Sequence, residues 1–122
     1  MSTAEEGQDA AQLAGLFSAL GDTTRLAIVT RLLDDRALSI STLSAESSLT
    51  RQAVTKHLQV LEHAGIVTRH RVGRQAQYSL RPAAIRDARR YLEDVSRQWD
   101  EAIDRLKVHL GEPGHAAGRG PE

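Results

Sequence analysis

Cysteine is absent from this sequence of 122 residues, and aromatic residues make up only 3% of it. Without cysteine the chain has no disulfide framework, no thiolate metal ligand and no redox-active thiol. The scarcity of aromatics leaves Leu, Ile, Val and Ala to form the core, and an apolar fraction of 40% is large enough for one. By length we expect one small domain that buries about two thirds of its unfolded surface.

The sequence also lacks an apolar run close to the roughly 20 residues that a membrane span needs. It has no leader in which basic residues precede an apolar stretch. A charged fraction of 26% is typical of a soluble surface. These features predict a cytoplasmic protein that does not associate with membranes.

The formal net charge is zero, but the charges are distributed unevenly. Residues 1–22 carry four acidic side chains and no basic one, whereas residues 50–81 carry six Lys or Arg side chains and one acidic residue, Glu62. The distribution bears on nucleic-acid binding more than the sum does, because binding depends on a local positive surface. A charge cluster is also compatible with an ordinary solvated face, so it identifies no partner by itself.

Apolar periodicity and capping residues predict four helices in the first half of the chain. The first ends at Gly21, the second is capped by Asp22, a short third begins near Ser41, and the fourth is capped by Thr50 and ends at Gly65. The apolar residues at helical spacing in the first two helices are Leu13, Leu16, Phe17, Leu20, Leu26, Ile28, Val29, Leu32 and Leu33.

After the fourth helix the apolar period changes from helical to alternating. The stretches IVTRHRV and QAQYSL flank a turn at Gly73 and predict a β-hairpin. Pro82 suits the first turn of a last helix, whose apolar residues then recur every three or four positions to Leu110, over about 43 Å. The predicted fold is mainly α with a small hairpin, a domain over residues 10–110 between flexible segments 1–9 and 111–122.

The fourth helix has two contrasting faces on a helical wheel. Val54, Leu58 and Leu61 form an apolar stripe, and the opposite side carries Gln52, Thr55, Lys56, Gln59 and His63, with Arg51 at its margin. Compact, basic and hydrogen-bonding side chains near a helix N-terminus suit the edges of bases in the DNA major groove. A solvated surface helix is the alternative, but such helices usually carry Glu–Lys pairs four residues apart, and none occurs between 50 and 60.

A short helix, a serine turn and this fourth helix together predict a helix-turn-helix. The hairpin behind it then forms a wing, with Arg69 and Arg71 on one strand and Arg74 beyond Gly73. These arginines can reach a flanking phosphate or the minor groove. Such contacts are independent of base sequence and sensitive to salt.

The stretches LFSALGDTTRLAIVTRLL, LTRQAVTKHLQVLEHAGIV and RVGRQAQYSL resemble the arsenic-repressor (ArsR/SmtB) family of bacterial winged-helix regulators, in register over about residues 11–110. The resemblance implies a winged helix-turn-helix homodimer that represses transcription at an imperfect inverted repeat in double-stranded DNA. It also implies structural roles for Arg25, Leu58 and Leu61. The expected DNA-binding residues are Thr50, Arg51, Gln52, Ala53, Thr55 and Lys56 on the helix, and Arg69, Arg71, Arg74 and Gln75 in the wing.

The chain departs from the family where its members sense effectors. Metal-sensing members carry cysteines on the helix before the recognition helix, and the corresponding segment here, SISTLSAES, has none. Persulfide-sensing members need a cysteine pair, which is also absent from this sequence. In the family's other zinc site, His109 and Glu112 match the second half of the ligand pattern, but the first half falls on Ser96 and Gln98. We therefore expect no metal or cofactor, with a sensor at His109 and Glu112 as the alternative, and the sequence names no inducer.

A smaller departure lies in the turn of the helix-turn-helix. Relatives commonly have Gly where this chain has Ser48. If φ is positive there, the strain is on the order of 1 kcal/mol.

The last helix is longer than one winged-helix core requires. Together with the first helix it predicts a two-fold interface, in which Trp99 is the expected anchor. The interface residues that we expect are Leu13, Leu16, Phe17, Leu92, Val95, Trp99, Ile103 and Leu106. Such a dimer would set its two recognition helices one turn of DNA apart, about 34–36 Å.

Two further interpretations bear on function. His57 lies toward the apolar side of the fourth helix, which favours a hydrogen-bonded packing role over metal binding. No arrangement of a nucleophile with a base, no phosphate loop and no catalytic carboxylate pair stands out, so we do not expect an enzyme. A winged-helix module whose basic face meets an acidic protein is the alternative to a DNA-binding regulator.

Overall fold

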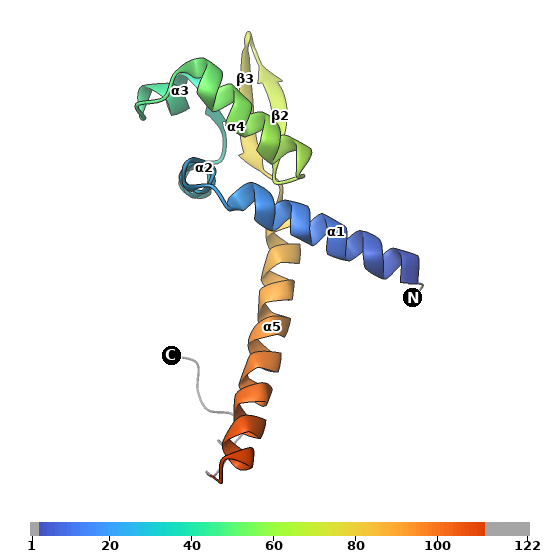
Figure 1. Cartoon of the computed structure of the whole chain (residues 1–122). Helices are drawn as coiled ribbons and strands as arrows, with labels where there is room; N and C mark the ends of the chain where they lie inside the picture. Colours follow the sequence, from blue (N-terminus) through green and yellow to red (C-terminus); the bar gives the residue numbers. More distant parts are fainter. Residues whose placement is uncertain (1–2, 112–122) are drawn as a thin grey trace. The chain divides into compact units, whose positions relative to one another are not determined.

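The computed structural model describes residues 3–111, with side chains from Asp9 onward. Within that range the elements are α1 (Thr3–Leu20), α2 (Thr23–Asp34), β1 (Leu38–Ser39), α3 (Ile40–Ala45), α4 (Arg51–His63), β2 (Val67–Val72), β3 (Gln75–Leu80) and α5 (Pro82–His109) (Figure 1). The chain divides into two compact units, Met1–Ala88 and Arg89–Glu122, with the boundary inside α5. Residues 112–122 of the expected flexible tail, including Glu112, lie outside the described residues.

The first two helices follow the predicted pattern, except that α1 begins earlier than expected. α1 begins at Thr3, inside the stretch that we expected to be a flexible terminus. The stretch is polar overall, but it contains Ala, Glu and Gln, which have high helix propensity. α2 starts after Asp22, whose carboxylate accepts the backbone N–H of Arg25 at 3.0 Å, as predicted. The domain boundaries at 10 and 110 stay predictions.

Both ends of α4 are fixed by the residues that the sequence indicated. The Thr50 hydroxyl caps the helix by accepting the N–H of Ala53 at 3.1 Å. At the other end Gly65 has a φ of 78°, and the N–H groups of Gly65 and Ile66 donate to the carbonyls of Glu62 and Leu61 at 3.0 and 2.9 Å. This pair of hydrogen bonds is the Schellman arrangement that ends many helices at a glycine.

The helix-turn-helix is confirmed, with small shifts in α3. The helix begins at Ile40, capped by Ser39, and ends at Ala45 instead of at the serine pair. Ser44 donates to the Leu49 carbonyl at 2.9 Å, and Ser47 accepts the Leu49 N–H at 3.2 Å, so serine hydroxyls satisfy the backbone of the turn. Ser48 does not have a positive φ, so the strain considered for that position does not arise.

The predicted hairpin is present, as part of a three-stranded antiparallel sheet in the order β1-β3-β2. β2 pairs with β3 from Val67 opposite Leu80 to Val72 opposite Gln75, and Gly73 in the turn has a φ of 64°. The sequence did not predict β1, because a strand of two residues is too short to show an alternating pattern.

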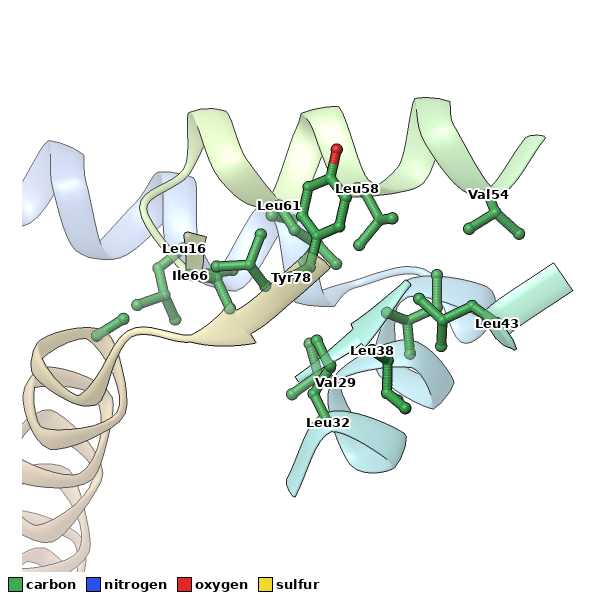
Figure 2. Packing of buried hydrophobic residues seen from close by; sticks show 14 residues of the cluster. Leu16, Val29, Leu32, Leu38, Leu43, Val54, Leu58, Leu61, Ile66 and Tyr78 are labelled. Carbon is green, nitrogen blue, oxygen red and sulfur yellow. The ribbon is translucent and has the colours of Figure 1, made fainter. Parts of the chain in front are cut away.

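One apolar cluster fills the first unit and supports α4 from behind (Figure 2). Its most completely buried members are Val54, Leu58 and Leu61 of α4, with Ile66 and Val67. The rest of the cluster comes from the other elements of the unit: Leu16, Ala19, Ile28, Val29, Leu32, Leu38, Leu43, Tyr78 and Ala84. Because each buried Leu or Val contributes about 1.5–3 kcal/mol, the apolar face of α4 is firmly seated, which leaves its polar face outward.

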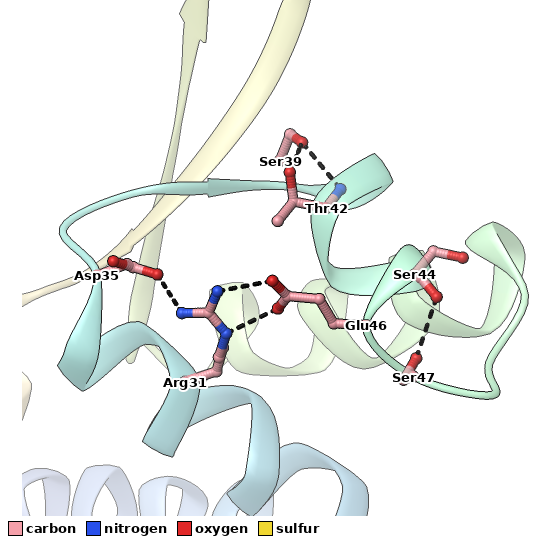
Figure 3. A network of polar contacts seen from close by, with 7 residues as sticks. All are labelled: Arg31, Asp35, Ser39, Thr42, Ser44, Glu46 and Ser47. Carbon is pink, nitrogen blue, oxygen red and sulfur yellow. Dashed lines mark hydrogen bonds and ion pairs between the residues drawn. The ribbon is translucent and has the colours of Figure 1, made fainter.

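A bidentate ion pair joins α2 to the end of α3 (Figure 3). Arg31 donates from Nε and Nη2 to the two carboxylate oxygens of Glu46, at 2.7 and 2.8 Å, and its Nη1 also pairs with Asp35. These hydrogen bonds from Arg31 hold the pKa of the Glu46 carboxyl below its ordinary value. The network therefore fixes the first helix of the helix-turn-helix to the body of the unit.

In the second unit, the part of α5 beyond Arg89 carries most of its large apolar side chains on the surface. Tyr91, Leu92, Val95, Trp99, Leu106 and Val108 are all exposed, as is Leu110 just after the helix. Pro82 begins the helix, as predicted. No helix in the described part of the chain is both long and apolar enough to cross a membrane.

Candidate nucleic-acid interface

The outward face of α4 is polar and basic at its N-terminal end. Arg51, Gln52 and Lys56 are exposed, and Thr55 is half-buried beside them. The first turn of α4 has no acidic residue, and the helix carries one carboxylate, Glu62, near its other end. The N–H groups at the start of the helix add partial positive charge to this surface.

Two of the expected DNA-binding residues on α4 also have structural roles. The Thr50 oxygen is occupied as the helix cap, and the Thr55 hydroxyl donates to the Arg51 carbonyl at 2.8 Å. A hydroxyl that donates still has lone pairs, so Thr55 can accept a hydrogen bond from a base. Ala53 is half-buried and offers only its methyl group.

Arg51 is held by a residue that sequence reasoning missed. Its Nη1 donates to the Ser41 hydroxyl of α3 at 2.6 Å, and both side chains lie at the surface. The ten-residue separation across a turn gave no sequence signal for this pair. The contact restricts the Arg51 guanidinium to a position beside α3.

The wing carries the basic residues that the sequence placed there. Arg69, Arg71, Arg74 and Gln75 are all exposed. Arg69 lies opposite Tyr78 and Arg71 opposite Ala76, so both arginines share the sheet face that packs Tyr78 into the core. Beyond the core, this face of the hairpin is therefore exposed and carries basic side chains.

Acidic side chains are few near α4 and the wing. Between Leu49 and Leu80 the only Asp or Glu is Glu62. Glu46, just before the turn, is paired with Arg31 on α2. The surface formed by α4 and the wing is consequently positive despite the zero net charge of the chain.

His57 has the hydrogen-bonded packing role that we predicted. Its Nδ1 lies 3.4 Å from Arg25 Nη1 and 3.8 Å from Asp22 Oδ2. Arg25 in turn donates from Nε to the Ala19 carbonyl at 2.6 Å, which gives Arg25 the structural role implied by the resemblance. The sequence had assigned Asp22 only to the cap of α2 and missed its position beside His57.

The residues expected at a dimer interface differ in how much of each side chain is exposed. Leu92, Val95, Trp99 and Leu106 are exposed and Ile103 is partly exposed, whereas Leu16 is only 6% exposed because it belongs to the core of the first unit. Leu13 and Phe17 are half-buried. Leu16 therefore has little surface left for a partner.

The chain is similar to known transcriptional regulators along most of its length. A family described as a helix-turn-helix domain matches residues 20–70. An uncharacterized HTH-type transcriptional regulator of Bacillus subtilis, YuzN, is 43% identical over 65 residues, covering 48% of this chain and 71% of YuzN. A transcriptional repressor SmtB homolog of Synechocystis is 32% identical over 91 residues, covering 75% of this chain and 68% of that protein.

Among solved structures, an ArsR-like transcriptional regulator from Rhodococcus sp. RHA1 superimposes with a TM-score of 0.72. It is 35% identical, and the match covers 84% of this chain and 95% of that one. With a helix-turn-helix and a basic wing in the expected order, the chain belongs to the ArsR/SmtB family of winged-helix, DNA-binding transcriptional regulators.

Proposed function

We propose that this protein is a homodimeric repressor that binds an inverted-repeat operator through α4 and the wing. The observation that carries the proposal is the division of α4, whose apolar face is buried at Val54, Leu58 and Leu61 while Arg51, Gln52 and Lys56 face outward. A helix seated in this way can enter the major groove without disturbing the core.

The two parts of the surface have different tasks in this proposal. Gln52, Thr55 and Lys56 read base edges, and each good contact contributes about 1–3 kcal/mol of discrimination. Arg69, Arg71 and Arg74 neutralise phosphates, which adds affinity without base preference and makes binding depend on salt. Arg51, whose guanidinium donates to the Ser41 hydroxyl, adds a further phosphate contact.

The exposed apolar stripe of α5 supports the dimer. Leu92, Val95, Trp99, Ile103, Leu106 and Leu110 recur every three or four residues and so share one side of the helix. Trp99 is 66% exposed in the single chain. Large exposed apolar patches on soluble proteins commonly mark protein–protein contacts, and a second copy would cover this stripe symmetrically.

The repressor role is supported by the relative that is named a transcriptional repressor. Because this chain contains no cysteine, any effector would act without a thiol or thiolate ligand. His109 is exposed at the end of α5, and Glu112 lies outside the described residues, so a metal role for this pair stays an untested alternative.

Selection of bound duplexes from a random DNA pool tests the proposal. We expect enrichment of two inverted half-sites whose centres are about 10–10.5 base pairs apart, on one face of the duplex. The enriched duplex, placed upstream of a reporter gene, should lower expression when the protein is present. A pool with no preferred sequence would contradict the proposal and favour an acidic protein partner for the basic surface.

A further inference from the structure

Three side chains converge behind the outward face of α4, at the end of α1. Arg25 connects the Ala19 carbonyl of α1, 2.6 Å from Nε, with His57 of α4, 3.4 Å from Nη1. Asp22 Oδ2 lies 3.8 Å from the same His57 nitrogen and also accepts the Arg25 backbone N–H at 3.0 Å. His57 thus lies between a cation and a carboxylate, one residue after Lys56 of the DNA-reading face.

The contact with Arg25 requires a neutral His57. A guanidinium group only donates hydrogen bonds, so the imidazole Nδ1 must accept and the ring proton must be on Nε2. In this state one guanidinium joins the recognition helix to the last turn of α1.

A proton on Nδ1 reverses these preferences. The nitrogen then becomes a donor that faces another donor, and two positive charges lie 3.4 Å apart. Asp22 becomes the better partner, because an opposite charge at this distance favours the protonated ring. The hydrogen bond from the Arg25 N–H, and then the Arg25 charge, lower the pKa of the Asp22 carboxyl, so Asp22 offers a negative charge to a protonated ring.

The other charged groups on the elements around His57 are exposed to solvent or paired with one another. α3 contains no titratable residue, and the acidic residue of α1 nearest to Ala19 in sequence is Asp9, about 15 Å away along the helix. On α2, Arg31 is paired with Glu46 and Asp35. The remaining charged or titratable side chains are all exposed: Asp34 on α2, Arg51, Lys56, Glu62 and His63 on α4, and Arg69, His70 and Arg71 on β2.

We propose, on the basis of the DNA-binding function proposed above, that His57 is a proton-sensitive positioning residue for the recognition helix. Neutral His57 accepts from Arg25 and keeps α4 in register with the end of α1. Protonation exchanges Arg25 for Asp22, releases the guanidinium from its place between the two helices, and weakens operator binding. Acid is therefore a negative effector of this regulator.

The affinity for the selected operator duplex, followed from pH 8 to pH 5.5, tests the inference. His57→Gln is the reference variant, because a glutamine oxygen can accept from Arg25 but takes up no proton in this range. On acidification, wild-type binding should weaken relative to His57→Gln by about fivefold or more, the lower end of common allosteric couplings. His63 and His70 are exposed and present in both proteins, so a contribution from either one cancels in the ratio.

Two more variants separate a proton response from a purely structural role. Asp22→Asn keeps an efficient helix cap but removes the charge, so the loss of binding should move to lower pH. His63→Gln, which alters an exposed histidine six residues further along α4, should keep the wild-type profile.

Each outcome bears on a separate proposal. Parallel pH profiles for wild type and His57→Gln, with both proteins folded by circular dichroism and binding at pH 8, would overturn the role of His57 and leave the proposed function intact. Failure of the wild type to prefer any duplex at pH 8 would overturn the proposed function and this inference with it.

Discussion

At the scale of single residues, the polar side chains of the helix-turn-helix differ in what already engages them. Thr50 caps α4, Thr55 donates to the backbone of its own helix, and Arg51 donates to Ser41. Gln52 and Lys56 are exposed on the same surface. Base discrimination should consequently depend most on Gln52 and Lys56. The hydrogen bond to Ser41 restricts the orientation of Arg51.

Substitution at Gln52 should change specificity, whereas substitution in the wing should change affinity. Gln52→Ala should relax the preference at one base position in each half-site, at a cost of about 1–3 kcal/mol for the preferred base. Arg74→Gln should weaken binding to all duplexes alike and reduce the slope of log affinity against log salt by about one. Competition binding with single-base variants of the operator, at several salt concentrations, measures both effects.

Gln59→Ala is the matched control for Gln52→Ala, because Gln59 is an exposed glutamine two turns further from the start of the same helix. Its base preferences should equal those of the wild type. Equal loss of binding to every duplex in both the Gln52 and Arg74 variants would show that the two residues do not divide these tasks.

Glu46 should contribute stability that depends on pH. Its pKa is lowered by the hydrogen bonds from Arg31, so the folded protein binds this proton less readily than the unfolded chain does. The contribution is therefore present above the ordinary pKa of a carboxyl group and is lost as the pH falls from that value through the lower pKa of the folded state. Glu46→Gln should lower the thermal midpoint at pH 7, and its difference from wild type should shrink toward pH 3.5.

Glu62→Gln removes an exposed carboxylate of α4 and serves as the control. Its thermal midpoint should follow the wild-type value across the same pH range. A Glu46→Gln midpoint that stays equally far below wild type from pH 7 to pH 3.5 would mean that packing, not the ion pair with Arg31, accounts for the loss.

At the scale of elements, the caps and breaks of the chain made most of the fold predictable. Asp22, Thr50, Gly65, Gly73 and Pro82 each start or stop an element where local backbone chemistry requires it. The misses have equally local causes. β1 is too short to carry a period, and the first residues of α1 are polar but have good helix propensity.

The candidate site was predictable only in part, because its contacts join distant positions. The outward residues of α4 and the wing follow from periodicity alone. The pairs Arg51–Ser41 and His57–Arg25 join residues 10 and 32 positions apart, and Arg31–Glu46 joins residues 15 apart. Such contacts depend on how helices pack, which no local pattern encodes.

The glycine at the end of α4 allows a direct test of whether a single residue ends the helix. Gly65 has a φ of 78°, so Gly65→Ala forces a side chain into the left-handed region and should destabilise the fold by about 1–2 kcal/mol. Each kcal/mol corresponds to roughly 4 °C in the thermal midpoint, since this chain is longer than domains of about 100 residues and shorter than those of about 150. Thermal unfolding at one fixed protein concentration measures it, since association would shift the midpoint with concentration.

Gly15→Ala is the matched substitution, and we expect it to raise the stability that Gly65→Ala lowers. Gly15 lies inside α1, and an added Cβ would meet no atom within 4 Å. Because Ala is favoured over Gly in a helix interior by about 0.5–1 kcal/mol, this variant should melt at a higher temperature than the wild type. A stabilised Gly65→Ala variant would show that the left-handed residue does not end the helix.

At the scale of the whole molecule, the proposed function depends on association of two copies. One recognition helix contacts a few base pairs, whereas two helices held by a symmetric interface read two half-sites together. The apolar stripe of α5 is the surface that such an interface would use. Loss of association should therefore weaken operator binding even though α4 and the wing are unchanged.

Two neighbouring residues of α5 allow a matched test of the dimer. Leu106 is 55% exposed and Val108 is 65% exposed, yet positions two apart on a helix point about 200° away from each other. Only Leu106 lies on the predicted stripe, so Leu106→Asp should weaken dimerisation by at least about 2 kcal/mol, or roughly thirtyfold. Val108→Asp adds the same charge on the other side and should associate as the wild type does.

Sedimentation velocity over a range of protein concentrations measures the association of both variants. The same samples titrated with the operator duplex should show weaker, half-site binding for Leu106→Asp and wild-type binding for Val108→Asp. If both variants remain dimeric and bind the operator equally well, the dimer does not use the apolar stripe of α5. Association of the chain would then have to rest on α1, where Leu13 and Phe17 are half-buried and Leu16 is already part of the core.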